Sequence, residues 1–426
     1  MKLIEKILEN SNVRIALEKV ITNKGAAGID GMKVEELRAY MNENWSSIKQ
    51  SILERSYKPA PVRKVAIPKP NGGVRKLGIP TVVDRTVQQS IVQILTPIFE
   101  AEFQENSYGF RPGRSCEQAV LKLLEYLNEG YEWIVDIDLE KFFDNVPQDK
   151  LMSYVGRVIR DPDTESLIRR YLKSGVMENG IYEATELGTP QGGNLSPLLS
   201  NVMLNELDKE LVKRGLRYVR YADDCIIAVG SSASANRVMH TITKWIEQKL
   251  GLKVNATKTH VCRPNKLKYL GFGFYKSTQT RQWSARPHES SVEKFQRKLK
   301  SLCKRSWSIS LTDRIAMLNS VIRGWINYFS IGAMKSRIEK IDAHLRTMLR
   351  KVIWKQWKTP QKRAWGLRKL GVDNDLAKLT SYCGNRYEWV VRKTCVAWAI
   401  SKEILTRRGL VSCLDYYTIR HSLKTN

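Results

Sequence analysis

The stretch LRYVRYADDCIIAV, residues 216–229, contains two apolar runs that meet at a pair of adjacent carboxylates. Residues 216–221 and 225–229 are rich in β-branched and aromatic side chains, so they predict two strands joined by a tight hairpin turn. Such a turn exposes Asp223 and Asp224 together. Turns favour Asp in any case, so an ordinary Asx turn is the alternative interpretation of this pair.

A second acidic run precedes this hairpin in the sequence WIVDIDLE, residues 133–140. Residues 133–138 read as a strand, which places Asp136 and Asp138 on one face because successive side chains alternate. Two carboxylates beside a core are costly unless a cation neutralises them. We therefore expect a divalent metal site at which Asp138 and Asp223 act as bridging ligands and Asp224 supports them.

Carboxylates brought together in this way suit phosphoryl transfer from a nucleoside triphosphate. Hard oxygen ligands hold Mg²⁺, with Mn²⁺ as a substitute; one ion activates a 3′-hydroxyl and a second stabilises the pyrophosphate leaving group. Phe142 and Phe143 follow the acidic strand, and either presents an apolar wall beside the sugar of a nucleotide. A bulky side chain there selects deoxyribonucleotides by excluding a 2′-hydroxyl, with simple core packing as the alternative.

The segments around the acidic residues predict an α+β fold. A helix is expected from near Pro197, with Ser196 as its N-cap and Gly215 just beyond its end, and another helix ends at Gly251. Residues 59–80 read as a basic hairpin, and residues 1–60 read as helices with a Gly-rich loop at 23–31. After residue 286 the pattern is helical. The helix that begins near Pro197 is expected to bury the stripe Leu199, Met203, Leu207 and Leu211. The basic hairpin carries Lys64, Lys69, Arg75 and Lys76.

The charge of the chain is strongly positive and unevenly distributed. Its 71 Lys and Arg against 43 Asp and Glu give a net charge of +28. Residues 281–426 hold 31 basic and 10 acidic side chains, a net of +21, which leaves +7 for residues 1–280. A surplus of this size indicates a polyanionic partner, and nucleic acid is the expected one.

Eight of the 11 tryptophans lie in the same basic region after residue 280, for example Trp354, Trp357 and Trp365. Aromatic faces can stack on bases while neighbouring Lys and Arg hold phosphates. The same tryptophans can equally fill helical cores, and the sequence leaves both readings open for Trp354 and Trp357.

Cysteine spacing and hydropathy indicate the cellular setting. The seven cysteines are scattered without a Cys-x-x-Cys pair, which argues against zinc and against a disulfide framework. No signal-peptide run follows Met1, and no stretch of about 18 apolar residues occurs. We expect a protein of the bacterial cytoplasm with no membrane association; its state as monomer or homodimer is undetermined.

These motifs identify the chain as resembling reverse transcriptases. Tyr221–Asp224 is similar to the signature turn of that family, and DLEKFFD, residues 138–144, is similar to its first catalytic strand. In the family the metal-binding Asp lies five residues before the aromatic steric gate. The resemblance therefore favours Asp138 over Asp136 and Phe143 over Phe142.

The resemblance implies further nucleotide-binding residues. GTPQGGNLSP, residues 188–197, is similar to the loop that contacts template and nucleotide, which implies that Gln191 contacts the base pair. Lys69 and Arg75 match residues of the fingers that hold the triphosphate. Lys258 matches a lysine proposed to protonate pyrophosphate, and KYLGF, residues 268–272, is similar to the primer grip.

Three further features resemble the proteins encoded by bacterial group II introns. These features are KGAAGIDG at 24–31, SYGFRP at 107–112 and RGWINYF at 323–329, the last being typical of the maturase thumb. The resemblance covers about residue 15 to beyond 400. It implies contacts to RNA or template by Lys24, Gly25, Arg111, Arg323 and Trp325.

The resemblance implies a right-hand polymerase with three parts. Residues 1–285 form fingers and palm, with 1–60 as an N-terminal extension; residues 286–370 form the helical thumb or maturase X domain; residues 371–426 form a small basic DNA-binding domain. Many relatives end in a Cys-rich endonuclease domain. This chain shows no such cluster, so it resembles the compact class that lacks DNA cleavage activity.

The implied function is RNA-directed DNA polymerase and maturase. The expected partners are group II intron RNA, an RNA template with a DNA primer, deoxynucleoside triphosphates and target DNA, into which the intron RNA inserts before it is copied during retrohoming. Two alternatives are a reverse transcriptase of another bacterial retroelement, of diversity-generating or retron type, and a non-catalytic RNA-splicing factor. The maturase resemblance around Trp325 argues against the first, and the intact Asp138, Gln191, Asp223 and Asp224 argue against the second.

Overall fold

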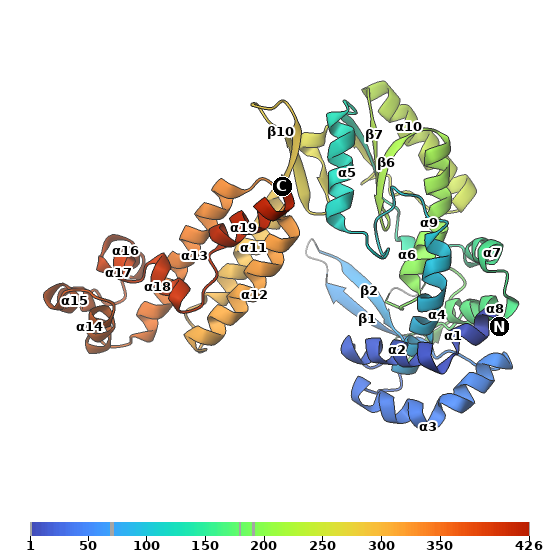
Figure 1. The fold of residues 1–426 in the computed structure, drawn as a ribbon, viewed down its shortest axis with the longest axis horizontal. Coiled ribbons are helices and arrows are strands. Elements are labelled where there is room, and N and C mark those ends of the chain that lie inside the picture. Colours follow the sequence, from blue (N-terminus) through green and yellow to red (C-terminus); the bar gives the residue numbers. More distant parts are fainter. Residues whose placement is uncertain (1, 69–71, 179, 190–191, 426) are drawn as a thin grey trace. The chain divides into compact units, whose positions relative to one another are not determined.

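The computed structural model describes residues 2–68, 72–178, 180–189 and 192–425 (Figure 1). The chain divides into two compact units, Met1–Arg263 and Pro264–Asn426. The division falls earlier than the predicted boundary at 285/286, because the strands between 268 and 287 pair with one another and not with the sheets of the first unit.

The first unit begins with helices that pack around one long helix. Asn12 ties them together, since its amide donates to the carbonyls of Ile7 (2.8 Å) and Ser90 (3.0 Å). The side chain of Thr81 caps the long helix by accepting a hydrogen bond from the Asp84 N–H. The helices are α1 (Leu3–Ile7), α2 (Asn10–Thr22), α3 (Val34–Leu53) and the long α4 (Val82–Glu100).

A small four-stranded sheet follows, with the strand order β2-β1-β4-β5. The predicted basic hairpin forms its first half, and the antiparallel register pairs Lys64 with Gly78 and Ile67 with Arg75. Residues 69–71, between the two strands of this hairpin, lie outside the described residues. The strands are β1 (Val62–Pro68), β2 (Val74–Ile79), β4 (Val176–Glu178) and β5 (Ile181–Glu183).

The central sheet of the first unit has the strand order β6-β7-β3-β8. The predicted strands are confirmed to within one residue: β3 (Trp133–Ile137), β6 (Arg217–Tyr221) and β7 (Asp224–Val229), with β8 (His260–Cys262) beside them. The other helices of this unit are α5 (Cys116–Asn128), α6 (Phe142–Asn145), α7 (Gln148–Ile159), α8 (Pro162–Leu172), α9 (Ser196–Lys213) and α10 (Ser232–Trp245).

Helix α9 confirms the predicted buried stripe, since Leu199, Met203, Leu207 and Leu211 are all at most 1% exposed. Its start differs from the prediction. Ser196 is the first helical residue and not the N-cap, because its N–H already bonds to the Gly193 carbonyl at 3.3 Å. Helix α10 continues through a π-helical turn and ends, as predicted, at Gly251 in the left-handed conformation.

The second unit is helical after one small sheet of order β11-β10-β9. Trp325 lies in an aromatic cluster that joins sheet and helices, stacked on Phe295 (4.4 Å between ring centroids) and tilted against Phe329 (4.7 Å). The elements are β9 (Lys268–Tyr269), β10 (Phe272–Lys276), β11 (Trp283–Pro287), α11 (Glu289–Leu302), α12 (Leu311–Phe329), α13 (Lys335–Gln356), α14 (Pro360–Lys369), α15 (Asn374–Ser381), α16 (Tyr387–Lys393), α17 (Cys395–Ala399), α18 (Lys402–Arg407) and α19 (Cys413–Thr425).

Among the helices of the described ranges, none is both long enough and apolar enough to cross a membrane.

Candidate active site

The acidic residues converge through the pairing of β3 with β7. In this antiparallel register Asp136 lies opposite Ile226 and Ile137 lies opposite Cys225. Strand β3 ends at Ile137, and continuing the same register by one step would set Asp138 opposite Asp224. Side chains alternate along each strand, so Asp136, Asp138 and Asp224 share one face of the sheet, where opposed Cβ atoms lie about 5 Å apart.

The turn that carries Asp223 is tight and strained. Tyr221 pairs with Asp224, so Ala222 and Asp223 alone connect the two strands. Ala222 has φ 56°, the left-handed region that residues with a Cβ rarely adopt. Gly109 packs directly against it: a Cβ on Gly109 would lie 2.2 Å from the Ala222 nitrogen. Surrounding contacts therefore hold the turn in a conformation that its own sequence does not favour.

Arg220 secures the same turn from within the protein. Its side chain is 1% exposed and binds the Asp208 carboxylate through Nε (2.8 Å) and Nη2 (2.5 Å). Its Nη1 donates to the carbonyl of Ala222 at 2.8 Å, and Nη2 also donates to Ser107 Oγ at 2.7 Å. Arg220 thus connects the catalytic hairpin to helix α9 and to the segment around residue 107.

The carboxylates on the shared face repel one another. Partial loss of hydration and the charges of Asp223, Asp136 and Asp138 raise the pKa of Asp224 to about 6, against a smaller lowering effect of Lys258. Burial also raises the pKa of Asp136 to about 6. These shifts show a concentration of negative charge that the protein leaves only partly compensated.

Lys258 provides the nearest positive charge. Its Nζ lies 3.2 Å and 3.3 Å from the two carboxylate oxygens of Asp138. The surrounding segment is anchored to the same residue: Asn255 N–H donates to the Asp138 carbonyl (2.8 Å), and Asp138 N–H donates to Thr259 Oγ1 (3.1 Å). The sequence prediction placed Lys258 at the nucleotide. In the structure its ammonium group contacts the carboxylate of Asp138.

The acidic residues suit a divalent cation by their chemistry. Within the described ranges no group of three or more His, Cys, Asp and Glu side chains is arranged closely enough to hold a metal ion. The donor set is nevertheless three carboxylates with hard oxygen atoms, one of them with a raised pKa that a cation would lower. By the chemistry of their oxygen donors alone, Asp138, Asp223 and Asp224 are the candidate ligands for Mg²⁺.

A cavity of about 240 Å³ is lined by residues of the basic hairpin and by Phe143, but not by Phe142. Phe142 is 2% exposed and belongs to the core, so the two rings divide into one packing residue and one wall residue. Gly188 and Thr189 line the same cavity, with the Thr189 N–H donating to the Phe143 carbonyl at 2.7 Å. The buried hydroxyl of Thr189 has no hydrogen-bond partner among the described residues.

Two lysines of the hairpin line this cavity from the other side. Lys64 Nζ pairs with Glu178 at 2.6 Å and with Glu183 at 3.3 Å, and Lys76 Nζ lies 3.9 Å from Glu178. Arg75 is exposed and lies one position away on β2, so its side chain projects from the opposite face of the hairpin. Of the hairpin cations in the described residues, those that reach the cavity are Lys64 and Lys76, which the sequence prediction did not assign to the site.

Two predicted nucleotide-binding residues, Lys69 and Gln191, lie outside the described residues.

Among the predicted RNA contacts of the first unit, Arg111 requires a correction. Its side chain is 2% exposed, pairs with Glu100 at 2.6 Å and donates to the carbonyls of Gln104 (2.5 Å) and Ser107 (2.8 Å). A guanidinium enclosed in this way braces the loop around residues 104–111 and has no surface to offer to RNA.

Lys24 and Gly25 differ from each other in their surroundings. Lys24 is exposed, with φ 47°, and is free to meet a ligand. Gly25 allows a close contact within the protein, since a Cβ there would lie 2.2 Å from Nη1 of Arg85. The Arg85 guanidinium also donates to the Ala26 carbonyl, so the Gly-rich loop is docked on helix α4.

The two predicted RNA contacts in the second unit also differ in their surroundings. Arg323 is exposed on helix α12. Trp325 is partly buried and stacks on Phe295 in the aromatic cluster, so its ring packs within this unit, and its contact with RNA stays a prediction. Trp354, which the sequence left open, is 0% exposed and donates from Nε1 to the Gly384 carbonyl at 3.0 Å, so it also packs.

Arg220 is a further residue near the site that sequence reasoning missed. A buried arginine inside a strand resembles any exposed basic strand residue in sequence. Its immediate position before the acidic turn was the available signal, because the residue next to a strained turn is well placed to bind its carbonyl.

Two protein families match successive parts of this chain. The family described as "Reverse transcriptase (RNA-dependent DNA polymerase)" matches residues 67–274, and "Group II intron, maturase-specific domain" matches residues 292–371. The second match does not favour a retroelement of the diversity-generating or retron type. It also covers most of the predicted thumb.

Individual relatives cover different shares of the chain. Protein YkfC of Escherichia coli is 32% identical over 62% of this chain and 80% of its own length. The group II intron-encoded protein LtrA of Lactococcus lactis is 38% identical over 50% of this chain, but the match spans only 35% of LtrA. A chain of the solved partial Cas6-RT-Cas1–Cas2 complex aligns at 21% identity with a TM-score of 0.37, covering 58% of this chain and 43% of that chain. With both domain matches in sequence order and these relatives, the protein belongs to the family of group II intron-encoded reverse transcriptases with a maturase domain.

Proposed function

We propose that the chain copies RNA into DNA at the face shared by β3, β6 and β7, using Asp138, Asp223 and Asp224. The observation that carries this proposal is the β3–β7 register, because it unites carboxylates 85 or more positions apart in sequence. A polymerase needs carboxylates at one point, and this register brings the end of β3 next to the hairpin that carries Asp223 and Asp224.

Asp138, Asp223 and Asp224 would hold two Mg²⁺ ions, with Mn²⁺ as a substitute. When bound, such ions lower the pKa of the primer 3′-hydroxyl and offset the charge of the departing pyrophosphate. The protein's own contribution is positional. Arg220 and Gly109 fix the turn, and Lys258 keeps an ammonium group beside Asp138, where it can deliver a proton to the pyrophosphate product.

The cavity behind Phe143 is the proposed site for the incoming deoxynucleoside triphosphate. Phe143 bounds the space that a 2′-hydroxyl would need, and the Thr189 hydroxyl, which has no partner among the described residues, offers a hydrogen bond to the ligand. Lys64 and Lys76 provide positive charge for the phosphates, held in place by Glu178. Lys69, Arg75 and Gln191 stay part of the proposed nucleotide site by resemblance.

The second unit is the proposed site for structured RNA. We assign residues 286–370 to the maturase thumb, which binds group II intron RNA and promotes its splicing, and residues 371–426 to contacts with target DNA during retrohoming. The net charge of +21 over residues 281–426 supports binding through phosphates. Lys24 and Arg323, both exposed, are the predicted RNA contacts that the fold leaves accessible.

Primer extension with an RNA template, deoxynucleoside triphosphates and Mg²⁺ tests the catalytic proposal. The wild-type chain should yield long cDNA, and Asp223→Ala with Asp224→Ala should abolish synthesis while binding of a structured RNA stays unchanged. Loss of both properties would show that the carboxylates are structural, and synthesis by the double variant would refute the assignment.

Salt dependence tests the RNA-binding proposal separately. Binding through several phosphates should weaken steeply as salt concentration rises, with a slope of about −0.7 to −0.9 per neutralised phosphate in a plot of log affinity against log salt. A flat response would contradict a clamp that depends on the basic surface of the second unit.

A further inference from the structure

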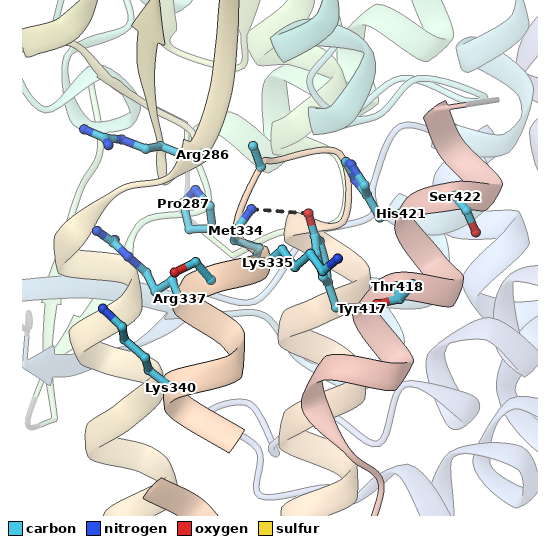
Figure 2. Close-up of a pocket in the computed structure, with 12 residues that line it drawn as sticks. Arg286, Pro287, Met334, Lys335, Arg337, Lys340, Tyr417, Thr418, His421 and Ser422 are labelled. Carbon is cyan, nitrogen blue, oxygen red and sulfur yellow. Dashed lines mark hydrogen bonds between the residues drawn. The ribbon is translucent and has the colours of Figure 1, made fainter. Parts of the chain in front are cut away.

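A cavity of about 810 Å³ lies in the second unit between the end of β11, the first turns of α13 and helix α19 (Figure 2). Four cationic side chains line it: Arg286, Lys335, Arg337 and Lys340. Of the described residues that line it, none carries a carboxylate. Figure 2 shows Arg286, Arg337 and Lys340 on one side of the cavity and Tyr417 on the other.

The wall of this cavity is held by hydrogen bonds. The buried hydroxyl of Tyr417 accepts from the Met334 N–H at 3.2 Å, drawn in Figure 2, and donates to the Gly332 carbonyl at 3.1 Å. Ala333 N–H donates to the Ala285 carbonyl at 2.9 Å, which ties the same loop to β11. The cations around the cavity thus extend from a backbone that is already in place.

The positive charge of the cavity is largely uncompensated. Arg337 pairs with Glu289 at 2.9 Å, and both side chains are solvent-accessible. Within the described ranges Arg286, Lys335 and Lys340 form no ion pair, although the Arg286 guanidinium lies over the Tyr275 ring at 5.4 Å. Cations gathered around a concavity without carboxylates favour an anionic ligand such as a phosphodiester.

The cavity shares its sheet with the segment that resembles a primer grip. Arg286 pairs with Gly273 of β10, and β10 pairs with β9 inside residues 268–272. The grip itself is anchored, because the Leu270 carbonyl accepts from the Tyr328 hydroxyl at 2.9 Å. A strand of nucleic acid that contacts the grip therefore meets the cavity on the same rigid support.

We propose that this cavity binds backbone phosphates of the primer strand as the duplex leaves the grip. The inference rests on the proposed polymerase function and adds a phosphate subsite to it. The grip segment on the same sheet selects the primer strand over other sources of phosphate. Intron RNA offers the same phosphodiester chemistry, so the experiment must separate the two.

The test compares two double variants that each remove two positive charges. Arg286→Gln with Lys340→Gln alters the cavity, whereas Lys213→Gln with Lys244→Gln removes lysines of α9 and α10 that line no part of the proposed sites. Binding of two probes is measured across a salt series: a DNA primer annealed to an RNA template, and an unprimed RNA hairpin of equal length. Circular dichroism verifies that both variants are folded.

The expected result is specific to the primed duplex. The cavity variant should bind it more weakly, with a salt slope shallower by about two, one for each phosphate that is no longer neutralised, and should bind the hairpin like wild type. The control variant should match wild type with both probes. Equal weakening on duplex and hairpin would overturn the assignment to the primer strand, and unchanged binding of both would overturn the subsite itself.

Failure of the underlying function looks different in the same preparations. A wild-type chain that extends no primer would refute the polymerase proposal, whatever the cavity variant binds. If wild type extends the primer and the cavity variant keeps its duplex affinity, only the phosphate subsite is refuted.

Discussion

Two acidic sites adjoin the hairpin β6–β7, and they differ in how their negative charge is compensated. On one side Arg220 binds the carboxylate of Asp208, with both side chains at most 1% exposed and two contacts of 2.5 Å and 2.8 Å. On the other side Asp138 and Asp224 share a face with Asp136, and Lys258 is the cation that contacts them, at Asp138.

This difference separates charges that serve the fold from charges that serve a ligand. A buried carboxylate matched by a guanidinium is satisfied without any external group. Burial, together with neighbouring carboxylates, raises the pKa of Asp224 and of Asp136, so their charged forms are destabilised in a way that a bound cation would relieve. The carboxylates near the turn are therefore the site that is suited to bind a cation.

The largest expected effect concerns the carboxylates that would bind a cation. Asp138→Asn should lower kcat/KM for primer extension by at least about 10³-fold, since several kcal/mol of charge stabilisation is removed. Asp136→Asn, two positions earlier on the same face, should change it by less than about tenfold. Steady-state primer extension measures both, and a greater decrease for Asp136→Asn would show that Asp136 is the metal ligand.

The next largest effect concerns the buried ion pair between Arg220 and Asp208. Arg220→Met leaves the buried Asp208 carboxylate without a partner and should lower the free energy of unfolding by about 3–5 kcal/mol, as measured by urea denaturation. A change under about 1 kcal/mol would contradict the view that this pair stabilises the fold.

A second variant distinguishes the structural role of Arg220 from its role in positioning the turn. Asp208→Leu combined with Arg220→Met removes both charges and should restore most of the stability. Primer extension should stay low, because the Ala222 carbonyl still lacks the donor that lies 2.8 Å away in the structure. Recovery of both stability and synthesis would show that Arg220 has no effect on the turn beyond packing.

The same comparison explains what the sequence can predict. The strands and the buried stripe of α9 follow from periodicity, because local residue order sets which face a side chain occupies. Whether a charged side chain forms an ion pair inside the protein depends on residues that are distant in sequence. Arg111 and Arg220 read as free cations, yet Glu100 and Asp208 enclose them.

Tryptophan shows the same limit. Trp325 and Trp354 stand in basic stretches like Trp365 and Trp398, but the first two pack whereas Trp365 is 58% and Trp398 is 69% exposed. The local composition is similar in the two cases. Only the docking of α11, α12 and the C-terminal helices decides which rings remain available for bases.

The third prediction compares two neighbouring aromatic rings, one that lines the cavity and one that packs in the core. Phe143→Ala should raise the preference for ribonucleotides over deoxyribonucleotides about 10-fold to 100-fold, because the cavity wall retreats. Phe142→Leu, in the core, should leave the sugar preference unchanged and cost about 1 kcal/mol of stability. Competition assays with the two nucleotide types measure the ratio, and an unchanged ratio in Phe143→Ala would remove it as the gate.

The smallest expected effect concerns the two faces of the hairpin. Lys76 lines the cavity, but its side chain is 58% exposed and shares Glu178 with Lys64, so its charge is partly met within the protein. Lys76→Gln should therefore raise the KM for deoxynucleoside triphosphates only about threefold to fivefold, roughly 1 kcal/mol or less. Arg75→Gln removes an equal charge from the opposite face and should change KM less. If the order of the two variants is reversed, the triphosphate meets the Arg75 face of the hairpin, and the cavity at Phe143 admits the sugar without its phosphates.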